Sequence, residues 1–253
     1  MDLPLGVVGV AFGTVLLPTF AGLFAKGDYD GAREALASSV RDLMFVMLPS
    51  AAGLFVLAPE VTRVIYEGHA FDATATLRVS RALAVYAVGL GLFGFQKSMV
   101  PWFQAQNDMK TPLRVSLMTI VLNATLNCLA VFLLPEWWRH VGLAASTVFC
   151  AGVGCVLLIV FARRRNGSVG LAACGRPIVK MMVAATAMVL AILALRPPLT
   201  ALLAPLSETA GRLLSLGTLI FTGALVYGVL ALVLMPDLAK GVLRRCRRRT
   251  ARA

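Results

Sequence analysis

Charged and chemically reactive residues are scarce in this chain of 253 residues. Asp, Glu, Lys and Arg together make up 14% of it, and only 2 His are present. His69 and His140 fall in short connectors, and no His-Glu-x-x-His, Gly-x-Ser-x-Gly or phosphate-loop pattern occurs. The 5 Cys show neither a disulfide framework nor metal-ligand spacing. The sequence therefore predicts no enzyme, no metal site and no bound cofactor.

Long apolar runs take the place of this chemistry. Hydrophobic residues make up 59% of the chain, and its mean hydropathy is +0.83. A helix needs about 20 apolar residues to cross the hydrocarbon core of a bilayer. About seven such runs are present: Leu5–Leu23, Val40–Leu57, Val79–Phe103, Leu113–Leu134, Val141–Ala162, Ile178–Leu195 and Leu213–Met235. The predicted fold is all-α, a polytopic membrane helix bundle of about seven transmembrane helices.

The net charge of +12 is distributed unevenly between alternate connectors. Seventeen of the 24 Lys and Arg residues follow the odd-numbered runs, and six follow the even-numbered ones. Because cytoplasmic connectors are the richer in Lys and Arg, we expect a periplasmic N-terminus and a cytoplasmic C-terminus. The basic tail, residues 237–253, then faces anionic lipid, and no nucleic-acid partner is predicted.

Lys97 is the one remaining cation, and it lies inside the third run. Such a charge is costly in a bilayer and usually faces a bundle interior or an aqueous cavity. The alternative is that its long side chain reaches the cytoplasmic interface. Tyr86 falls on nearly the same helical face, whereas Arg81 falls almost opposite and suits an outer interfacial anchor as well as a cavity.

A polar stripe marks the fourth run, where Ser116, Thr119, Asn123 and Asn127 share one helical face. Such residues commonly hold neighbouring membrane helices together by hydrogen bonds. A second interpretation is a small cation site, in which the two amide oxygens of Asn123 and Asn127 are joined by Thr147 of the next run. That site would couple transport to a monovalent cation; coupling to the membrane potential is the other option.

Helix breakers interrupt several runs, namely Pro18, Pro49, Pro101 and the group Gly89, Gly91 and Gly94. Transporters tolerate such breaks where neighbouring helices or a cavity satisfy the freed backbone groups. Pro and Gly are also simply commoner in membrane helices than in soluble ones, so both explanations stay open. Short amphipathic helices are expected over Ala32–Arg41, capped by Asp30, and after Pro59.

An ordered set of short motifs resembles the C-terminal half of the MurJ (MviN) lipid II flippase family, within the multidrug/oligosaccharidyl-lipid/polysaccharide exporter superfamily. The resemblance extends to about Ala162 and includes Lys97 and Asn127. Its other elements are Leu17-Pro18, Leu48-Pro49-Ser50-Ala51-Ala52-Gly53-Leu54, Tyr66-Glu67-Gly68-His69-Ala70-Phe71, Ala82-Leu83-Ala84-Val85-Tyr86-Ala87-Val88-Gly89-Leu90 and Gln106-Asn107-Asp108-Met109-Lys110-Thr111-Pro112.

The resemblance implies a MATE-like lobe over residues 1–165, incomplete at its N-terminus, and two extra helices over 176–236 that form a groove for a lipid tail. It implies alternating access, in which a cationic cavity takes the diphosphate and sugar head group of lipid II across the cytoplasmic membrane. Asp2, Arg81, Tyr86 and Lys97 are the expected cavity residues. The expected partners are lipid II, membrane lipids and a separate N-terminal half.

Two alternatives remain open. One is another substrate within the superfamily, as in an O-antigen-type lipid-oligosaccharide flippase or a drug exporter. The other belongs to a different class: an inactive truncated product or a membrane scaffold that transports nothing.

Overall fold

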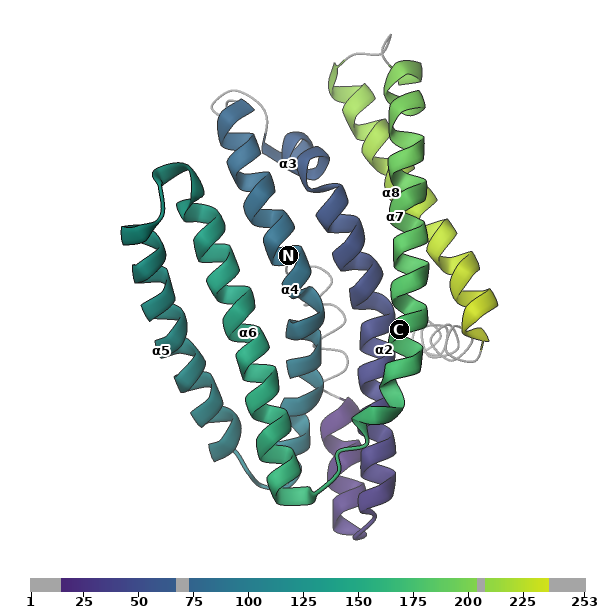
Figure 1. Ribbon diagram of the computed structural model, residues 1–253. Coiled ribbons are helices and arrows are strands. Elements are labelled where there is room, and N and C mark those ends of the chain that lie inside the picture. Colours follow the sequence, from purple (N-terminus) through teal and green to yellow (C-terminus); the bar gives the residue numbers. More distant parts are fainter. Residues whose placement is uncertain (1–14, 67–72, 204–207, 237–253) are drawn as a thin grey trace.

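The structure is a computed structural model that describes residues 15–66, 73–203 and 208–236. Within these ranges the chain is helical, without a strand (Figure 1). A first helix covers Val15–Ala25. It is followed by α2 (Tyr29–Val56), α3 (Ala58–Tyr66), α4 (Ala73–Gln104), α5 (Lys110–Leu133), α6 (Glu136–Asn166), the 3-10 turn η1 (Leu171–Cys174), α7 (Gly175–Leu203) and α8 (Glu208–Leu234).

The all-α membrane fold is confirmed. Of the described helices, α2, α4, α5, α6, α7 and α8 are long and apolar enough to cross a bilayer. The predicted run Leu5–Leu23 lies partly outside the described residues, which begin at position 15. Large apolar side chains cover the outer surface, and on α5 Val115 is the only fully buried one. Such a surface suits lipid, because helix association in a bilayer does not depend on burying apolar groups from water.

The N-terminal end of α2 differs from the prediction. The amphipathic segment Ala32–Arg41 is the first part of one continuous helix, and Asp28 caps it in place of Asp30. The Asp28 carboxylate accepts a hydrogen bond from the Gly31 N–H at 2.8 Å. Asp30 lies within the first turn and pairs with Arg33 at 2.7 Å. The reason is positional, since a cap must precede the first helical residue.

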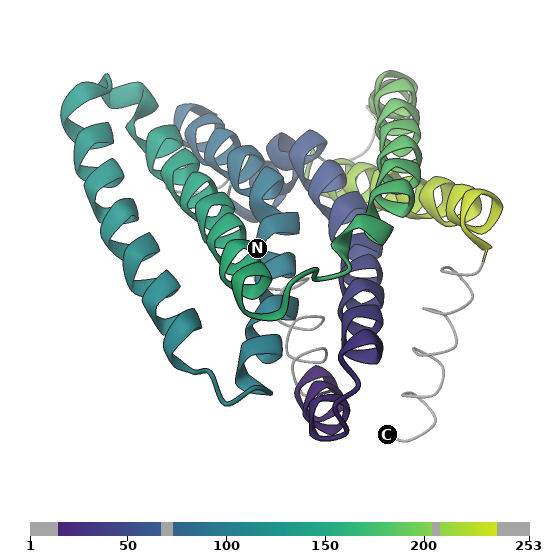
Figure 2. The ribbon, with the colours of Figure 1, turned by 60° about the horizontal axis from the view of Figure 1, so that its bottom comes forward.

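The helices form a lobe and an attached pair (Figure 2). In the lobe, α4 packs between α2 and α6, and α5 packs on the far side of α6. The pair α7–α8 contacts the lobe mainly through α2. The connectors before α2, between α4 and α5, and between α6 and α7 lie at one end of the bundle (Figure 1). We call this end, which carries the arginine-rich connectors, the basic end.

The interior Gly and Pro residues do not break the helices. Both α2 and α4 run continuously through them, and the glycines lie at close contacts. A Cβ atom on Gly89 would come within 2.8 Å of Val148 on α6, and one on Gly94 within 3.0 Å of Met47 on α2. These glycines therefore let α4 approach both neighbours closely.

Pro49 leaves one carbonyl group without its usual donor. Because proline has no N–H, the Phe45 carbonyl four residues earlier loses its helical hydrogen bond. The Tyr227 hydroxyl of α8 donates to this oxygen at 2.8 Å, and the two aromatic rings lie 5.5 Å apart. A neighbouring helix thus satisfies the group that Pro49 frees, as expected for a proline inside a membrane helix.

Candidate functional site

The predicted cavity residues on α4 separate into two groups. Lys97 is exposed although Ser98 and Met99 next to it are fully buried, and it forms no hydrogen bond or ion pair with a described residue. Tyr86 is half-buried, and eleven residues of continuous helix place it on nearly the same face as Lys97. These two residues therefore lie along one side of α4.

Arg81 points elsewhere. Its guanidinium carbon lies 5.5 Å from the ring centroid of Trp138 on α6, which is a cation–π distance. This contact is at the end of the bundle opposite the basic end, where an aromatic ring and a cation are typical of a membrane interface. The structure thus does not bring Arg81 together with Lys97. Asp2, the fourth predicted cavity residue, lies outside the described residues.

The predicted polar stripe of α5 forms a hydrogen-bonded network with α6. The Asn123 amide donates to the Thr147 hydroxyl at 3.3 Å, and the Asn127 amide donates to the Asn123 carbonyl oxygen at 2.9 Å. The Ser146 hydroxyl donates to the Asn127 carbonyl oxygen. Asn123, Asn127 and Thr147 therefore lie together, and Ser146 is a member that the sequence did not indicate.

This network joins two helices, as the first interpretation of the stripe requires. The amide oxygens of Asn123 and Asn127 are already hydrogen-bond acceptors within it. A cation would have to displace these donors to use the oxygens as ligands. Among the described residues, no group of three or more His, Cys, Asp or Glu side chains could hold a metal ion. The cation site stays a prediction.

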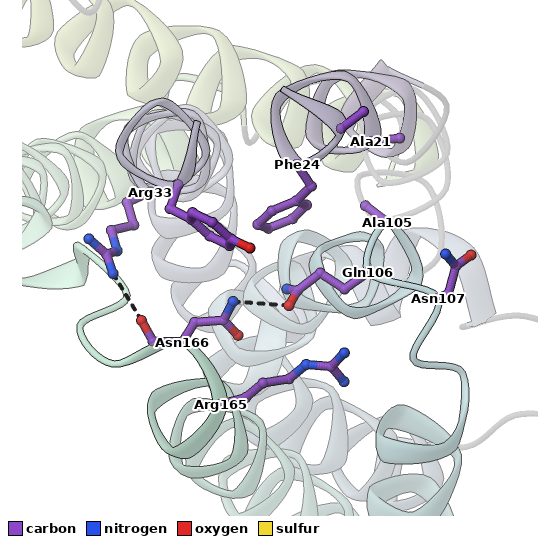
Figure 3. Close-up of a pocket in the computed structure, with 10 residues that line it drawn as sticks. Ala21, Phe24, Arg33, Ala105, Gln106, Asn107, Arg165 and Asn166 are labelled. Atoms are coloured by element: carbon purple, nitrogen blue, oxygen red, sulfur yellow. Dashed lines mark hydrogen bonds between the residues drawn. The ribbon is translucent and has the colours of Figure 1, made fainter. Parts of the chain in front are cut away.

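A pocket of about 860 Å³ opens at the basic end (Figure 3). The first helix, the start of α2, the α4–α5 connector and the end of α6 line it. Its polar side chains include Arg33, Arg165, Gln106 and Asn166, and Phe24 supplies an apolar wall. The Arg33 guanidinium group donates to the backbone carbonyl oxygen of Asn166 at 2.9 Å, which links α2 to the end of α6.

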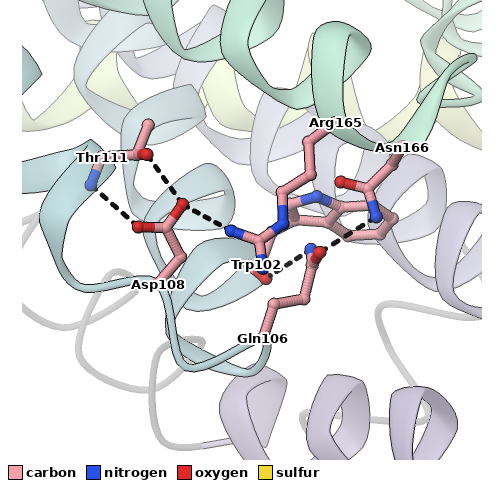
Figure 4. A network of polar contacts seen from close by, with 6 residues as sticks. All are labelled: Trp102, Gln106, Asp108, Thr111, Arg165 and Asn166. Atoms are coloured by element: carbon pink, nitrogen blue, oxygen red, sulfur yellow. Dashed lines mark hydrogen bonds and ion pairs between the residues drawn. The ribbon is translucent and has the colours of Figure 1, made fainter.

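The α4–α5 connector is fastened to α6 beside this pocket (Figure 4). The Asp108 carboxylate accepts hydrogen bonds from the Thr111 N–H at 3.0 Å and the Thr111 hydroxyl at 2.7 Å, and it pairs with Arg165 at 2.8 Å. The Asn166 amide donates to Gln106 at 2.9 Å, and Gln106 donates to the Trp102 carbonyl oxygen at 3.1 Å. Asn107 supplies the turn with a φ of 57°.

The pKa of Asp108 is lowered from its ordinary 3.8. Desolvation alone raises it, but the two hydrogen bonds from Thr111 and the charge of Arg165 together outweigh that effect. The carboxylate is therefore ionised at neutral pH and holds Arg165 in place. The sequence marked this connector as part of the family resemblance, but its contact with α6, some sixty residues away, depends on the tertiary fold.

Comparisons with known proteins agree with this architecture. The family described as "Lipid II flippase MurJ" matches residues 1–212. A probable lipid II flippase MurJ of Rhizobium tropici is 32% identical over 244 residues, which are 96% of this chain and 45% of that protein. The lipid II flippase MurJ of Burkholderia cenocepacia is 31% identical over 166 residues, 66% of this chain and 31% of that protein.

A solved structure has the same fold. It is titled "Lipid II flippase MurJ, inward closed conformation", and it matches with a TM-score of 0.71 at 20% identity, over 93% of this chain and 45% of that one. The chain spans less than half the length of these relatives. With most of its sequence matched by the family, and with six apolar helices of spanning length among its described residues, the chain belongs to the MurJ lipid II flippase family and is a multi-pass inner-membrane protein.

Proposed function

We propose that this chain forms the C-terminal part of a lipid II flippase that works by alternating access. Its relatives carry that name, and its fold resembles a lipid II flippase in an inward-closed conformation. Such a protein moves the undecaprenyl-diphosphate-linked precursor of peptidoglycan across the membrane and breaks no bond. The other lobe of the transporter would come from an N-terminal half, the partner that the chain's coverage of its relatives suggests.

The exposure of Lys97 is the observation that carries this proposal. A charged group in the interior of a membrane-spanning helix is costly unless it faces water or an opposite charge. Lys97 lies well inside α4, and no described carboxylate pairs with it. A diphosphate head group offers the missing counter-charge in a low-dielectric cavity. Tyr86, on the same side of α4, adds a hydroxyl group that can donate to the head group.

The sidedness follows from charge. We place the basic end in the cytoplasm, so that the pocket between Arg33 and Arg165 and the α4–α5 connector are cytoplasmic. Cysteines introduced at Ser168 and Glu136, both exposed, report on the two ends in a chain whose own 5 Cys have been replaced by alanine. A membrane-impermeant maleimide added from the periplasm should label position 136 and spare position 168. The reverse pattern would contradict this orientation.

The α7–α8 pair suits the polyprenyl chain more than the head group. Among the described parts of these helices, Gly217 and Gly228 on α8 border open space, because no atom lies within 4 Å of where a Cβ atom would stand at either position. Ala184 and Ala185 on α7 are instead buried in packing. A shallow apolar groove over residues 176–236 is thus the proposed place of the lipid tail, and the basic tail 237–253 anchors the end in the cytoplasm.

Growth supported by a full-length hybrid protein tests the role of Lys97. The chain is joined to the N-terminal half of the Rhizobium tropici relative, and its ability to sustain a MurJ-depleted bacterium is measured. Lys97→Ala should abolish growth, Lys97→Arg should retain part of it, and Lys26→Ala, an exposed lysine in the connector before α2, should have no effect. Full activity of Lys97→Ala at normal expression would leave interfacial snorkelling as the explanation of Lys97.

A further inference from the structure

Two arginines and a histidine gather at the end of the bundle opposite the basic end. Arg78 and Arg81 come from the first turns of α4, and His140 comes from the first turn or so of α6. Both guanidinium groups are within electrostatic reach of the His140 ring. Arg81 also lies over Trp138, whose ring is 5.0 Å from that of Trp137. Two helices thus bring three basic groups and two indole rings to one place, which we call the outer cluster.

The outer cluster has no acidic partner among the described residues. Neither Arg78 nor Arg81 forms an ion pair with a described carboxylate, since Glu60 is bound to Arg196 and exposed Glu136 pairs with none of these groups. His140 Nε2 is buried and has no hydrogen-bond partner in the described part of the chain. Like charges held close together repel one another, and a bound anion relieves this repulsion.

The backbone adds to the positive potential. Both α4 and α6 begin at this end, where the helix dipoles give a partial positive charge, and no side chain caps the start of α6. A guanidinium group binds phosphate through two parallel hydrogen bonds, and indole rings favour the head-group level of a bilayer. The chemistry that fits the outer cluster is therefore a phosphate group at the membrane interface.

We propose that the outer cluster binds the phosphate of an anionic phospholipid head group, held between Arg78 and Arg81 of α4 and His140 of α6. The lipid source is favoured over a free anion because Trp137 and Trp138 are 51% and 38% exposed beside the cations, in position to contact acyl chains. The site is separate from Lys97 and does not depend on flipping. Binding through defined donors on two helices distinguishes it from the general attraction of a basic surface for anionic lipid.

The chain's own tryptophans report on this site. Of its 3 Trp, Trp137 and Trp138 lie at the outer cluster, whereas Trp102 is 1% exposed near the basic end and supplies a constant background. The 253-residue chain is placed in phosphatidylcholine nanodiscs containing increasing fractions of brominated phosphatidylglycerol, whose bromine atoms quench nearby indoles. Brominated phosphatidylcholine serves as the neutral comparison. Half-maximal quenching should require a much smaller fraction of phosphatidylglycerol than of phosphatidylcholine.

Charge-removing variants separate a site from a surface. Arg78→Gln and Arg81→Gln should each weaken the preference for phosphatidylglycerol about tenfold, as expected for a lost hydrogen bond to a charged group. Arg139→Gln is the matched control: it removes an exposed charge from the same turn of α6, where the Arg139 Nε–H already donates to the Leu134 carbonyl oxygen. Arg78→Lys keeps the charge but not the two-pronged donor, and an intermediate preference is expected.

Three outcomes would overturn the proposal. One is an equal loss in Arg78→Gln, Arg81→Gln and Arg139→Gln, which would indicate only general electrostatic attraction. Another is equal quenching of the unmodified chain by the two brominated lipids. The third is release of the quenching by millimolar inorganic phosphate but not by chloride at equal ionic strength, which would identify a free anion as the ligand. Circular dichroism of each variant verifies that the helices are retained.

Discussion

The α5–α6 pair and the α7–α8 pair are both antiparallel pairs of membrane helices, but different contacts hold them together. Polar side chains join α5 to α6 through the network of Asn123, Asn127, Ser146 and Thr147. Apolar packing joins α7 to α8, where Gly223 lets Ile192 and Met188 approach the α8 backbone. In a bilayer the first kind of contact depends on hydrogen-bond partners and the second on shape.

The two pairs also differ in how they connect to the rest of the chain. The α5–α6 pair is fastened at the basic end through Asp108 and Arg165. Among the described residues, no such carboxylate lies where α7 begins and α8 ends. At that place Lys180 of α7 donates to the Leu234 carbonyl oxygen of α8 at 3.1 Å. A cation near a helix C-terminus is favourable because it offsets the partial negative charge. Four substitutions test whether this contrast governs stability.

Gly223→Leu should have the largest effect, because apolar packing holds α7 to α8 along most of their length. A Cβ atom at this position would lie 3.0 Å from Ile192 Cδ1, and a larger side chain would force the helices apart. Overpacking of this kind costs about 1–3 kcal/mol. Gly217→Leu is the control, since no atom lies within 4 Å of a Cβ atom there. Denaturation of the chain in mixed micelles measures both, and equal stability of the two variants would show that the pair is loosely packed.

Asn127→Leu should weaken the α5–α6 pair by about 1–2 kcal/mol, since it removes a donor to Asn123 and the acceptor of Ser146. Thr125→Val is the control, because the Thr125 hydroxyl donates only to the Val121 carbonyl oxygen of its own helix. A disulfide introduced between the two helices reports their separation. Unchanged crosslinking and stability in Asn127→Leu would mean that apolar packing holds this pair as well.

The sequence predicted the helices of both pairs but only part of their contacts. The membrane spans follow from the length of the apolar runs, and the stripe containing Asn123 and Asn127 follows from helical periodicity. Both could therefore be predicted from the sequence alone. Ser146 could not, because the register between two helices is set by packing along their whole length. Gly223 and Gly217 are the same residue type on one helix, and only the fold shows that Gly223 faces Ile192 while Gly217 faces open space.

For other contacts the sequence indicated one residue but not its partner. Pro49 indicates a carbonyl in need of a donor, yet nothing in the sequence shows that the donor is Tyr227, far along the chain. Arg81 was considered both as a cavity residue and as an interfacial anchor, and its contact with Trp138 favours the second role. Of the predicted cavity residues that the structure describes, Lys97 is the one whose side chain is charged and forms no ion pair, hydrogen bond or ring contact with a described residue.

Tyr227→Phe tests the polar tie of the apolar pair to α2. The substitution keeps the ring against Phe45 but leaves the Phe45 carbonyl without a donor, because Pro49 has no N–H. The expected loss is about 1 kcal/mol, the typical net value of one hydrogen bond. Tyr29→Phe, at a residue 52% exposed, is the control. If the two variants unfold alike, the carbonyl finds water or another donor, and α7–α8 depends on shape alone.

Acidification should separate the two pairs with the smallest effect of the four. The pKa of Asp108 is lower in the folded chain than its ordinary 3.8, so its ionised form stabilises the fold at neutral pH, and this contribution is lost as the pH falls through the folded value. Protonation weakens the contact with Arg165 and frees the end of α6. The contact between Lys180 and the Leu234 carbonyl oxygen involves no described carboxylate, so this end of the α7–α8 pair should not respond. Hydrogen exchange should therefore show lost protection near residues 105–111 and 163–166 but not near 231–234. The samples are labelled at different pH values, quenched at one common low pH, and corrected for the intrinsic exchange rates.

Asp108→Asn is the control, because it removes the titrating group and should abolish this pH dependence. If the pH dependence persists in that variant, another carboxylate causes the acid response.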